Sequence, residues 1–299
     1  MSAERPPSAP EHADNRGLRA FAEDALGSDV DIEDVSRGVG RLSIVWRLAA
    51  ADGSVCYLKH HESRMLFDRE DRAYAAWLPH LRKVPATHVP EVVARSEPLE
   101  ALILTSLPAA TPVPEITDQR TLAQAFRRAG RFLRCLHDLP LVEAAPDPIE
   151  HMRALIDRYV RGHAAAFDTR TIDGILADLD DGRPFAGAAF VCAHRDYSPR
   201  NWVLTEDGTL GVFDWERAQG DLWLADVTRM EFDVWHEQPA LRDAFFAGYG
   251  RALTTHDREQ VRLSMLIHAV ASAGWAAQRG DAHFEGLARA VIARLRAES

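Results

Sequence analysis

Hydrophobic and polar residues alternate in the first third of the chain, in the pattern that strands produce. Residues 30–35 read Val-Asp-Ile-Glu-Asp-Val and predict a half-buried strand, because successive side chains of a strand point to opposite faces. The Asp52-Gly53 pair predicts a tight hairpin turn. Further strands are predicted over residues 42–49, 55–59, 92–95 and 102–105.

Apolar residues recur at helical spacing over most of the remaining chain. The second of the predicted helices is expected to end at Pro79, because proline lacks the N–H that continues a helix. Short strands are predicted over residues 190–193, 202–205 and 210–213. Helices are predicted over residues 18–26, 64–78, 122–137, 149–167 and 172–179, and again from about residue 222.

This distribution of elements predicts an α+β fold with two lobes. A small β-rich N-lobe is expected over residues 17–106 and a larger α-helical C-lobe over residues 107–299. Residues 1–16 are rich in proline, alanine and charge, and they have no apolar core. They therefore predict a disordered tail rather than a signal peptide.

Composition disfavours several classes of protein. The net charge of −10 argues against nucleic acid as a partner, because phosphate backbones are bound mainly through Lys and Arg. No run of about 18 apolar residues occurs, so no membrane span is expected. The three cysteines have no CxxC spacing, which fits a reducing cytoplasm rather than a disulfide framework.

The strongest chemical signal is the segment from His194 to Asn201, which has the pattern H-R-D-x-x-x-x-N. In a kinase catalytic loop of this pattern, the aspartate takes the proton of the acceptor hydroxyl and the asparagine holds Mg²⁺. Asp196 is therefore predicted as the catalytic base and Asn201 as a metal ligand. Asp214, behind a turn and an apolar strand, is predicted to return to the same pocket as a second ligand. These residue types are also common in surface turns, but the flanking apolar strands favour the catalytic interpretation.

Lys59 ends a predicted strand and is one of only two lysines in the chain, the other being Lys83. A lysine at this place can reach the α- and β-phosphates of a nucleotide. An exposed lysine at a strand end is the ordinary alternative. The near absence of lysine elsewhere favours the nucleotide-binding role.

Glu70 on the following helix is the candidate partner that would direct Lys59 toward the phosphates. Ser43 is a candidate phosphate donor beside the glycines at positions 38 and 40. The glycine pair is nearly as well explained by a plain hairpin turn. Competing partners for the lysine are Glu62, Asp68 and Asp71.

With these motifs, the chain resembles the aminoglycoside phosphotransferase and choline kinase family, small-molecule kinases with a protein-kinase-like fold. Asp196, Pro199 and Asn201 are similar to the family's catalytic loop, although Arg195 and Arg200 stand where the family typically has glycines. The segment 213–216, Phe-Asp-Trp-Glu, is similar to the family's second motif.

The resemblance also implies roles for other residues. The backbone of Thr105 and Leu107 would meet adenine at the hinge between the lobes, and His194 and Asp226 would support the catalytic loop. A protein kinase is disfavoured, because Trp and Glu follow Asp214 in place of Phe and Gly and no A-P-E motif occurs downstream.

The acceptor is the least defined part of the prediction. Arg195 either binds an anionic group of the acceptor or pairs with a nearby carboxylate, and Glu216 is a further candidate contact. Several carboxylates of the C-lobe would suit an amine-bearing acceptor, although each is also typical of a solvated helix. They are Asp173, Asp178, Asp180, Asp181, Glu231, Asp233 and Glu237.

The sequence thus predicts a cytoplasmic ATP-dependent O-phosphotransferase with Mg²⁺ as cofactor and GTP as an alternative nucleotide. Its expected partner is a small molecule with a hydroxyl group, foremost an antibiotic. A metabolic kinase of choline, a sugar or an amino-alcohol is the alternative. A non-catalytic nucleotide-binding protein is a further alternative, which the joint presence of Lys59, Asp196, Asn201 and Asp214 argues against.

Overall fold

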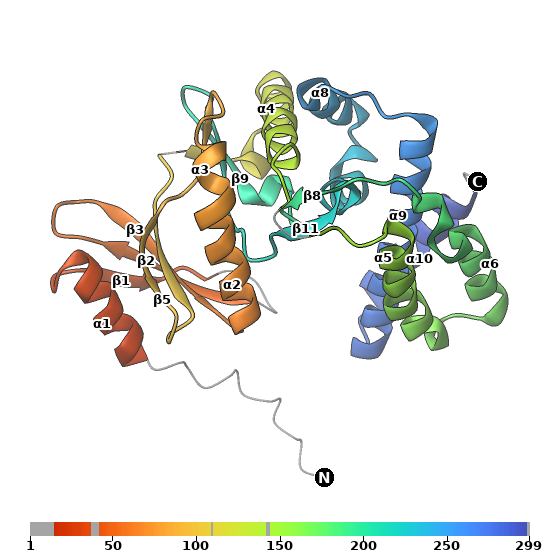
Figure 1. Cartoon of the computed structure of the whole chain (residues 1–299), viewed down its shortest axis with the longest axis horizontal. Coiled ribbons are helices and arrows are strands. Elements are labelled where there is room, and N and C mark those ends of the chain that lie inside the picture. The colour runs from red at the N-terminus through yellow and green to blue at the C-terminus, as the bar shows by residue number, and fades with distance from the viewer. Residues whose placement is uncertain (1–14, 37–41, 109, 142–143, 298–299) are drawn as a thin grey trace, which may run out of the picture.

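The N-lobe is built on a five-stranded antiparallel sheet. The computed structural model describes residues 15–36, 42–108, 110–141 and 144–297, so the glycines at positions 38 and 40 lie outside the described residues. All five predicted N-lobe strands are present (Figure 1). In sheet order they are β1 (Asp31–Asp34), β2 (Ser43–Ala49), β3 (Val55–His61), β6 (Ala101–Thr105) and β5 (Val92–Ser96).

The two faces of this sheet are covered by different helices, and this determines where Lys59 points. On one face, Leu58 and Ile103 pack in a core beneath α1 (Asn15–Leu26). Leu102 and Leu104 belong instead to the larger core on the opposite face. Because neighbouring strand residues point to opposite faces, Lys59 follows Leu58 and faces the larger core and α2 (Arg64–Arg72).

The helix after β3 does not end where the sequence predicted. After α2, a π-helical segment over Ala73–Trp77 leads into α3 (Leu78–Leu81). Pro79 lies in the first turn of α3. The N–H groups of a first helical turn have no intrahelical acceptor, so proline costs little at this position. The predicted end at Pro79 is therefore wrong.

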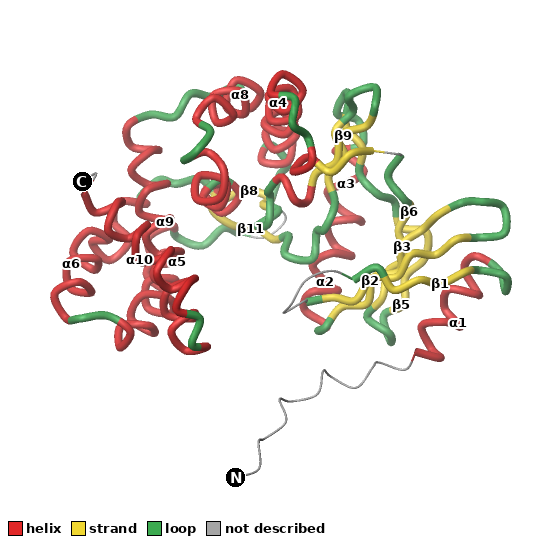
Figure 2. The backbone as a smooth tube through the Cα atoms, turned by 180° about the vertical axis from the view of Figure 1, so that it is seen from behind, coloured by secondary structure: helices red, strands yellow, loops and turns green. Residues whose placement is uncertain are grey.

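In the C-lobe, α4 (Gln119–His137) runs beside α8 (Pro239–Tyr249), as Figures 1 and 2 both show. Glycine allows this close approach. A Cβ atom on Gly130 would lie 2.0 Å from the Phe245 carbonyl oxygen, and one on Gly248 would lie 1.8 Å from the Arg127 carbonyl oxygen. The close packing gives α4 a fixed position. The predicted catalytic segment, residues 194–201, packs against this helix.

The far end of the C-lobe is helical, as predicted, but its first helix is shorter than expected. The helix predicted over residues 149–167 ends as an α-helix at Leu155 and continues as a π-helical segment, Ile156–Val160, and a 3₁₀ segment, Arg161–Ala166. None of the described helices is long and apolar enough to cross a bilayer. The helices of this end are α5 (Pro148–Leu155), α6 (Thr169–Leu179), α9 (Thr255–Arg279) and α10 (Ala282–Ala297).

Two small sheets frame the segments that carry the predicted chemistry. Residues 194–201 lie between β8 (Phe190–Ala193) and β9 (Trp202–Thr205), and Asp214 lies between β10 (Leu210–Val212) and β11 (Gln219–Leu222). The strands β4 (Thr87–His88), β7 (Ala110–Pro112) and β11 were not predicted, because their sequences lack the run of apolar residues that marks β8, β9 and β10. One sheet has the order β4, β10, β9 and β7, and the other pairs β11 with β8.

Candidate active site

Lys59 lies at the centre of a group of carboxylates from both lobes. Its Nζ is 2.8 Å from Glu70 Oε2 on α2 and 3.1 Å from Glu216 Oε2, and it also donates to Asp214 Oδ1. Glu70 Oε1 accepts from the backbone N–H of Trp215 at 3.1 Å. The expected Lys59–Glu70 pair is therefore present, and Glu70 links α2 to the loop that carries Asp214.

The charges in this group stabilise one another. Burial by itself lowers the pKa of Lys59, but Asp214, Glu70 and Glu216 together raise it well above its usual value. Burial raises the pKa of Glu70, but Lys59 and a hydrogen bond from His61 outweigh this effect. The pKa of Glu70 therefore lies below its ordinary value. Lys59 is therefore a cation and Glu70 an anion at neutral pH.

One buried cluster within the described part of the chain consists of residues whose types can bind a metal ion: His61, Glu70 and Glu216. Lys59 places its ammonium among them, which supplies the positive charge that these carboxylates need. His61 is hydrogen-bonded through both ring nitrogens. Its Nε2 lies 2.6 Å from Glu70 Oε2, and its Nδ1 lies 2.9 Å from the Glu100 carbonyl oxygen. The ammonium of Lys59 thus lies against two members of this cluster, and Glu216 lies at the lysine rather than at an acceptor surface.

Asp196 is buried and faces two arginines. Arg200 lies 2.5 and 2.6 Å from its two carboxylate oxygens, and Arg229 lies 3.3 Å from Oδ1. Burial raises the pKa of Asp196, but Arg200 and Arg229 outweigh this and hold it below its usual range. The carboxylate is therefore ionised at neutral pH, as a base that accepts a proton must be.

The catalytic segment is anchored by Asp226, which is fully buried. Its carboxylate accepts from the backbone N–H groups of His194 at 3.0 Å and of Arg195 at 2.5 Å. His137 at the end of α4 contacts the same carboxylate at 3.0 Å. The carboxylate thus satisfies two buried backbone donors at the point where the chain turns toward Asp196.

His194 joins the catalytic segment to the loop that carries Asp214. Its Nε2 bonds the carbonyl oxygen of Phe213 at 3.1 Å, while its Nδ1 is buried without a hydrogen-bond partner in the described residues. Nε2 therefore carries a proton, because a carbonyl oxygen can only accept. The bond links residue 194 to residue 213, so His194 and Asp226 have the supporting positions that the resemblance implied.

Aromatic packing fixes the same segment against α4. The Tyr197 hydroxyl donates to the Ala129 carbonyl at 2.8 Å, and the Tyr197 ring stacks on Phe132 at 6.3 Å. Trp215 packs against Phe132 at 6.1 Å and against His194 at 4.5 Å. These contacts between α4 and two loops were not predicted, because the residues are far apart in the sequence.

Asn201 and Asp214 fit the requirements of a magnesium ion. The Asn201 side chain donates through Nδ2 to the Asp196 carbonyl at 2.9 Å, which leaves its Oδ1 atom as a ligand. Asp214 is about one-third exposed and uses Oδ1 for Lys59, which leaves Oδ2. Mg²⁺ prefers a small number of such oxygens and completes its shell with water and phosphate. Arg195 and Asp214 both adopt positive φ, 63° and 67°, a conformation that costs non-glycine residues energy and that is common at active sites.

The two residues expected at the nucleotide base, Thr105 and Leu107, differ in whether the backbone N–H group is already hydrogen-bonded. The backbone N–H of Thr105 already donates to the Glu91 carbonyl at 2.8 Å. The Leu107 N–H has no hydrogen-bond partner among the described residues, although the Leu107 carbonyl accepts from Ser106 at 2.8 Å. Leu107 is thus the residue of the pair with a donor to spare. Ser43 starts β2, opposite His61 of β3.

Four of the seven carboxylates that suited an amine-bearing acceptor pair with arginines among the described residues. Burial raises the pKa of Glu231, and Arg242, 3.5 Å away, opposes that effect. The Asp233 side chain lies outside the described residues, and Glu237 and Asp173 are exposed. The remaining pairs are Asp178 with Arg296, Asp180 with Arg183 and Asp181 with Arg153.

Arg195 pairs with a carboxylate, which is one of the two roles that the sequence suggested for this residue. Its Nε lies 2.7 Å from Asp221 Oδ2, and Asp221 Oδ1 lies 3.0 Å from His151. Asp221 belongs to the Gly220-Asp221 pair that follows the segment similar to the family's second motif. Arg229, which also faces Asp196, was not anticipated, and no local motif marks it, because it lies 33 positions along the chain from Asp196.

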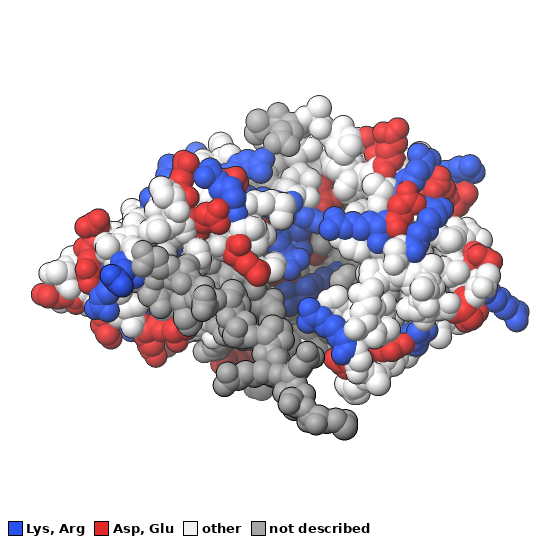
Figure 3. Space-filling view, turned by 90° about the horizontal axis from the view of Figure 1, so that it is seen from below, with Lys and Arg blue, Asp and Glu red and all other residues white. Residues whose placement is uncertain are grey.

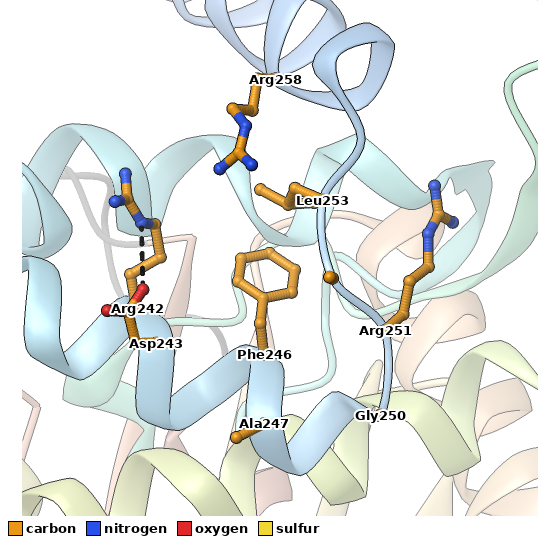
Figure 4. Close-up of a pocket in the computed structure, with 9 residues that line it drawn as sticks. Arg242, Asp243, Phe246, Ala247, Gly250, Arg251, Leu253 and Arg258 are labelled. Carbon is orange, nitrogen blue, oxygen red and sulfur yellow. Dashed lines mark ion pairs between the residues drawn. The ribbon is translucent and has the colours of Figure 1, made fainter.

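A separate pocket of about 460 Å³ lies between the end of α8 and the start of α9 (Figure 4). Arg258 points toward Phe246 and Leu253 there, whereas Arg251 points away. Arg251 is instead paired with Asp257. The residues that line this pocket include none of the predicted site residues, so it is distinct from the cluster around Lys59 and Asp196.

The comparison with known families agrees with this geometry. Residues 36–263, more than half of the chain, match the model of the phosphotransferase enzyme family. This chain belongs to the phosphotransferase enzyme family. No curated protein has a significantly similar sequence.

Solved structures show that the phosphotransferase shares its fold with enzymes that modify antibiotics. The apoenzyme of macrolide 2′-phosphotransferase MphH from Brachybacterium faecium is 18% identical and superposes with a TM-score of 0.65, covering 93% of this chain and 98% of that one. The GDP and kanamycin complex of APH(2″)-IIia is 13% identical, with a TM-score of 0.70 and coverage of 94% and 98%. A ternary complex of an APH(4)-Ia mutant with ADP and hygromycin B is 16% identical, with a TM-score of 0.68 and coverage of 93% and 97%. The expected two-lobed kinase-like fold is therefore confirmed.

Replacing Asp226 by Asn in this phosphotransferase is expected to loosen the catalytic segment. The amide keeps one acceptor oxygen but cannot accept from both the His194 and Arg195 N–H groups with two oxygens, as the carboxylate does. Leaving one buried donor unpaired costs about 1–3 kcal/mol, which urea denaturation measures as a lower free energy of unfolding. Unchanged stability would mean that Asp226 does not anchor the segment.

Proposed function

We propose that this protein is an ATP-dependent O-phosphotransferase that transfers the γ-phosphoryl group of ATP to a hydroxyl of a small molecule, foremost an antibiotic. The proposal is carried by one hydrogen bond, from His194 to the Phe213 carbonyl, which joins two groups of functional residues. The Lys59 cluster includes Asp214, the catalytic segment includes Asp196 and Asn201, and His194 bonds the Phe213 carbonyl between them. A nucleotide-binding lysine and an ionised carboxylate thus face one site.

In the proposed reaction, Lys59 binds the α- and β-phosphates and Glu70 keeps the ammonium directed toward them. Asp196 accepts a hydrogen bond from the acceptor hydroxyl, orients its oxygen toward the γ-phosphorus and takes its proton as the new P–O bond forms and the bond to the leaving ADP breaks. Asn201 and Asp214 are the proposed ligands of Mg²⁺, which when bound supplies neutralisation of phosphate charge. Rate enhancement then comes mainly from positioning and charge.

The identity of the nucleotide is proposed from the fold and from the hinge residue Leu107. The Leu107 N–H is the donor that we assign to the base of the nucleotide. Solved structures of similar fold bind ADP in one case and GDP in another, which supports a nucleotide site between the lobes. We therefore propose ATP as the donor, with GTP as the comparison in every assay.

An antibiotic acceptor is supported by the acceptors named for similar structures. These structures contain kanamycin or hygromycin B, and a third is a macrolide phosphotransferase. At Asp196, however, the neighbouring charged groups are Arg200 and Arg229 rather than carboxylates. Arginines favour a neutral or acidic acceptor over a polycation, because like charges repel in a partly buried site.

The proposal is tested by ADP release in the presence of Mg²⁺. The purified protein is assayed with ATP or GTP and with macrolide, aminoglycoside, nucleoside and peptide antibiotics, together with choline and simple sugars. We expect acceptor-dependent ADP release and a product heavier than the acceptor by one phosphoryl group in mass spectrometry. Nucleotide binding without turnover on any of these acceptors would favour a non-catalytic protein instead.

The paired Arg200 predicts a shift in the pH dependence of turnover. Arg200 holds the pKa of Asp196 down, so the wild-type base stays ionised until the pH falls below the ordinary aspartate range. In Arg200→Ala this pKa rises, because burial is then opposed only by the weaker effects of Arg229 and His194. The acid limb of kcat/KM, measured from roughly pH 3 to 8, is therefore expected to move to higher pH.

Arg170 on α6 provides the control for this measurement, because it is exposed and forms no ion pair with the described residues. Arg170→Ala should keep the wild-type profile. An acid limb that stays in place in Arg200→Ala would show that Asp196 is not the titrating base.

A further inference from the structure

Arg195 lies directly before the proposed base, Asp196, in a backbone conformation that is costly for it. Its φ angle of 63° lies in the left-handed region, where a side chain costs energy and glycine does not. The backbone torsions of Arg195 set the direction in which the chain continues, and so they help to determine where the Asp196 carboxylate points. A residue that holds Arg195 in this conformation therefore also holds the base.

Two buried carboxylates hold Arg195, one at its backbone and one at its side chain. The backbone N–H donates to Asp226 Oδ1 at 2.5 Å, and Asp226 accepts from the His194 N–H as well. The side-chain Nε lies 2.7 Å from Asp221 Oδ2. Among the described residues, the Asp221 side chain reaches the catalytic segment through Arg195 alone. Any effect of this carboxylate on the base must therefore pass through Arg195.

Asp221 is itself fixed in position. It lies on β11, which pairs with β8, the strand that leads into the catalytic segment. Its Oδ1 accepts from the Leu222 N–H at 2.8 Å and lies 3.0 Å from His151 Nε2 on α5. Burial raises the pKa of Asp221, but His151 and Arg195 outweigh this effect and hold it below its usual value. The partner of Arg195 is thus a buried and ionised carboxylate that two structural elements keep in place.

The charges around the base explain why Arg195 has a carboxylate of its own. The whole chain carries a net charge of −10, but Figure 3 shows Lys and Arg side chains gathered around the hollow in the middle of the face seen from below. Asp196 is already shared by Arg200 and Arg229. Within the described part of the chain, Arg195 pairs with Asp221 and not with the adjacent Asp196. The carboxylate of the base is thereby left to the other two arginines and to the acceptor.

We propose that Asp221 is a positioning residue for phosphoryl transfer, which acts on Asp196 by holding Arg195 in its left-handed conformation. The charged hydrogen bond to Asp221 restrains the side chain of Arg195, while the bond to Asp226 restrains its backbone. Without Asp221, Arg195 relaxes toward negative φ, which costs it less, and the Asp196 carboxylate moves away from the acceptor oxygen. This inference rests on the proposed function, because it concerns the same base.

The proposal is tested by a double-mutant cycle between Asp221→Asn and Arg195→Gly, measured as steady-state ADP release by the full-length protein with its best acceptor. Asparagine keeps an oxygen for the Leu222 N–H but lacks the charge that pairs with the guanidinium. In the wild-type background, Asp221→Asn is expected to lower kcat by about 10- to 100-fold, because a small misplacement of a catalytic group costs this much. Glycine adopts a φ of 63° without strain, so in the Arg195→Gly background the same substitution should cause no further loss.

Two further measurements separate positioning from a general loss of structure. The KM of ATP and the dissociation constant of ADP should keep their wild-type values in Asp221→Asn, because the residues assigned to the nucleotide are unchanged. Asp29→Asn is the matched control, since Asp29 is an exposed aspartate before β1. It should leave kcat unchanged in the wild-type background and in the Arg195→Gly background.

Arg195→Ala provides a second test that leaves Asp221 intact, and it decides the matter if Asp221→Asn melts below the wild-type temperature. Alanine lacks the guanidinium and is strained at positive φ, so its kcat should fall below that of Arg195→Gly. Equal kcat in the alanine and glycine variants would overturn the proposal. So would wild-type turnover in a folded Asp221→Asn variant, or a loss of the same factor in both backgrounds of the cycle.

The failure of this proposal can be told apart from the failure of the proposed function. A wild-type protein that releases no ADP with any acceptor overturns the proposed function, and the positioning role falls with it. A wild-type protein that releases ADP, with equal losses from Asp221→Asn in both backgrounds, retains the proposed function and loses only the positioning role of Asp221.

Discussion

Asp196→Asn is expected to lower kcat by about 10²–10⁴-fold, the usual range for removal of a general base. The amide is nearly isosteric with the carboxylate but cannot accept the hydroxyl proton. Nucleotide affinity should change little, because the nucleotide contacts are assigned to Lys59, Asn201 and Asp214. The measurement is steady-state ADP release with the best acceptor of the panel, together with the dissociation constant of ADP.

The control for this variant is Asp173→Asn on α6, an exposed aspartate that one interpretation of the sequence placed at an amine-bearing acceptor. It should keep wild-type kcat, KM and stability. Near-normal turnover in Asp196→Asn would remove Asp196 from the mechanism, and a loss of activity in Asp173→Asn would return the α6 carboxylates to the acceptor site.

Lys59→Met is expected to reduce both activity and stability. Loss of one charged group on the phosphates lowers kcat/KM for ATP by about 10²–10³-fold. The same change leaves Glu70 and Glu216 buried without their shared cation, and breaking a buried ion pair in this way costs about 3–5 kcal/mol. Urea denaturation of the nucleotide-free protein measures the second effect separately from catalysis.

Lys83 supplies a matched control, since it is the second of the two lysines in the chain and is exposed. Lys83→Met should leave the free energy of unfolding and the KM of ATP at wild-type values. A Lys59 variant that is as stable as the wild type would show that the three carboxylates are not held by the lysine, even if activity is lost.

The architecture of the N-lobe could be predicted because its signals are local. The alternating residues of β1 and the Asp52-Gly53 turn between β2 and β3 depend on backbone geometry that the next few residues decide. Strands β4, β7 and β11 could not be predicted, because they lack a run of apolar residues and are stabilised by partners distant in the chain. The helix break at Pro79 was misplaced because a π-helical segment moved proline into a first turn.

The candidate site divides in the same way. Asp196, Asn201 and Asp214 stand at a spacing that the chemistry itself imposes, so the sequence predicted them together. Arg229 reaches Asp196 from the segment after β11, and nothing near it in the sequence indicates a partner. Glu70 could be proposed but not separated from Asp68 or Asp71, since all three lie on one helix and only packing decides which faces the sheet.

What the sequence determined by itself is the chemistry of the site: a lysine, a base and two oxygen ligands in the order of a kinase, on a chain whose pattern divides into a β-rich and an α-helical lobe. The tertiary structure decided how the charges are matched. Lys59 shares its charge among three carboxylates, and Asp196 lies between two arginines. Charge balance depends on distances between segments far apart in the chain, and those distances exist only after the lobes have packed.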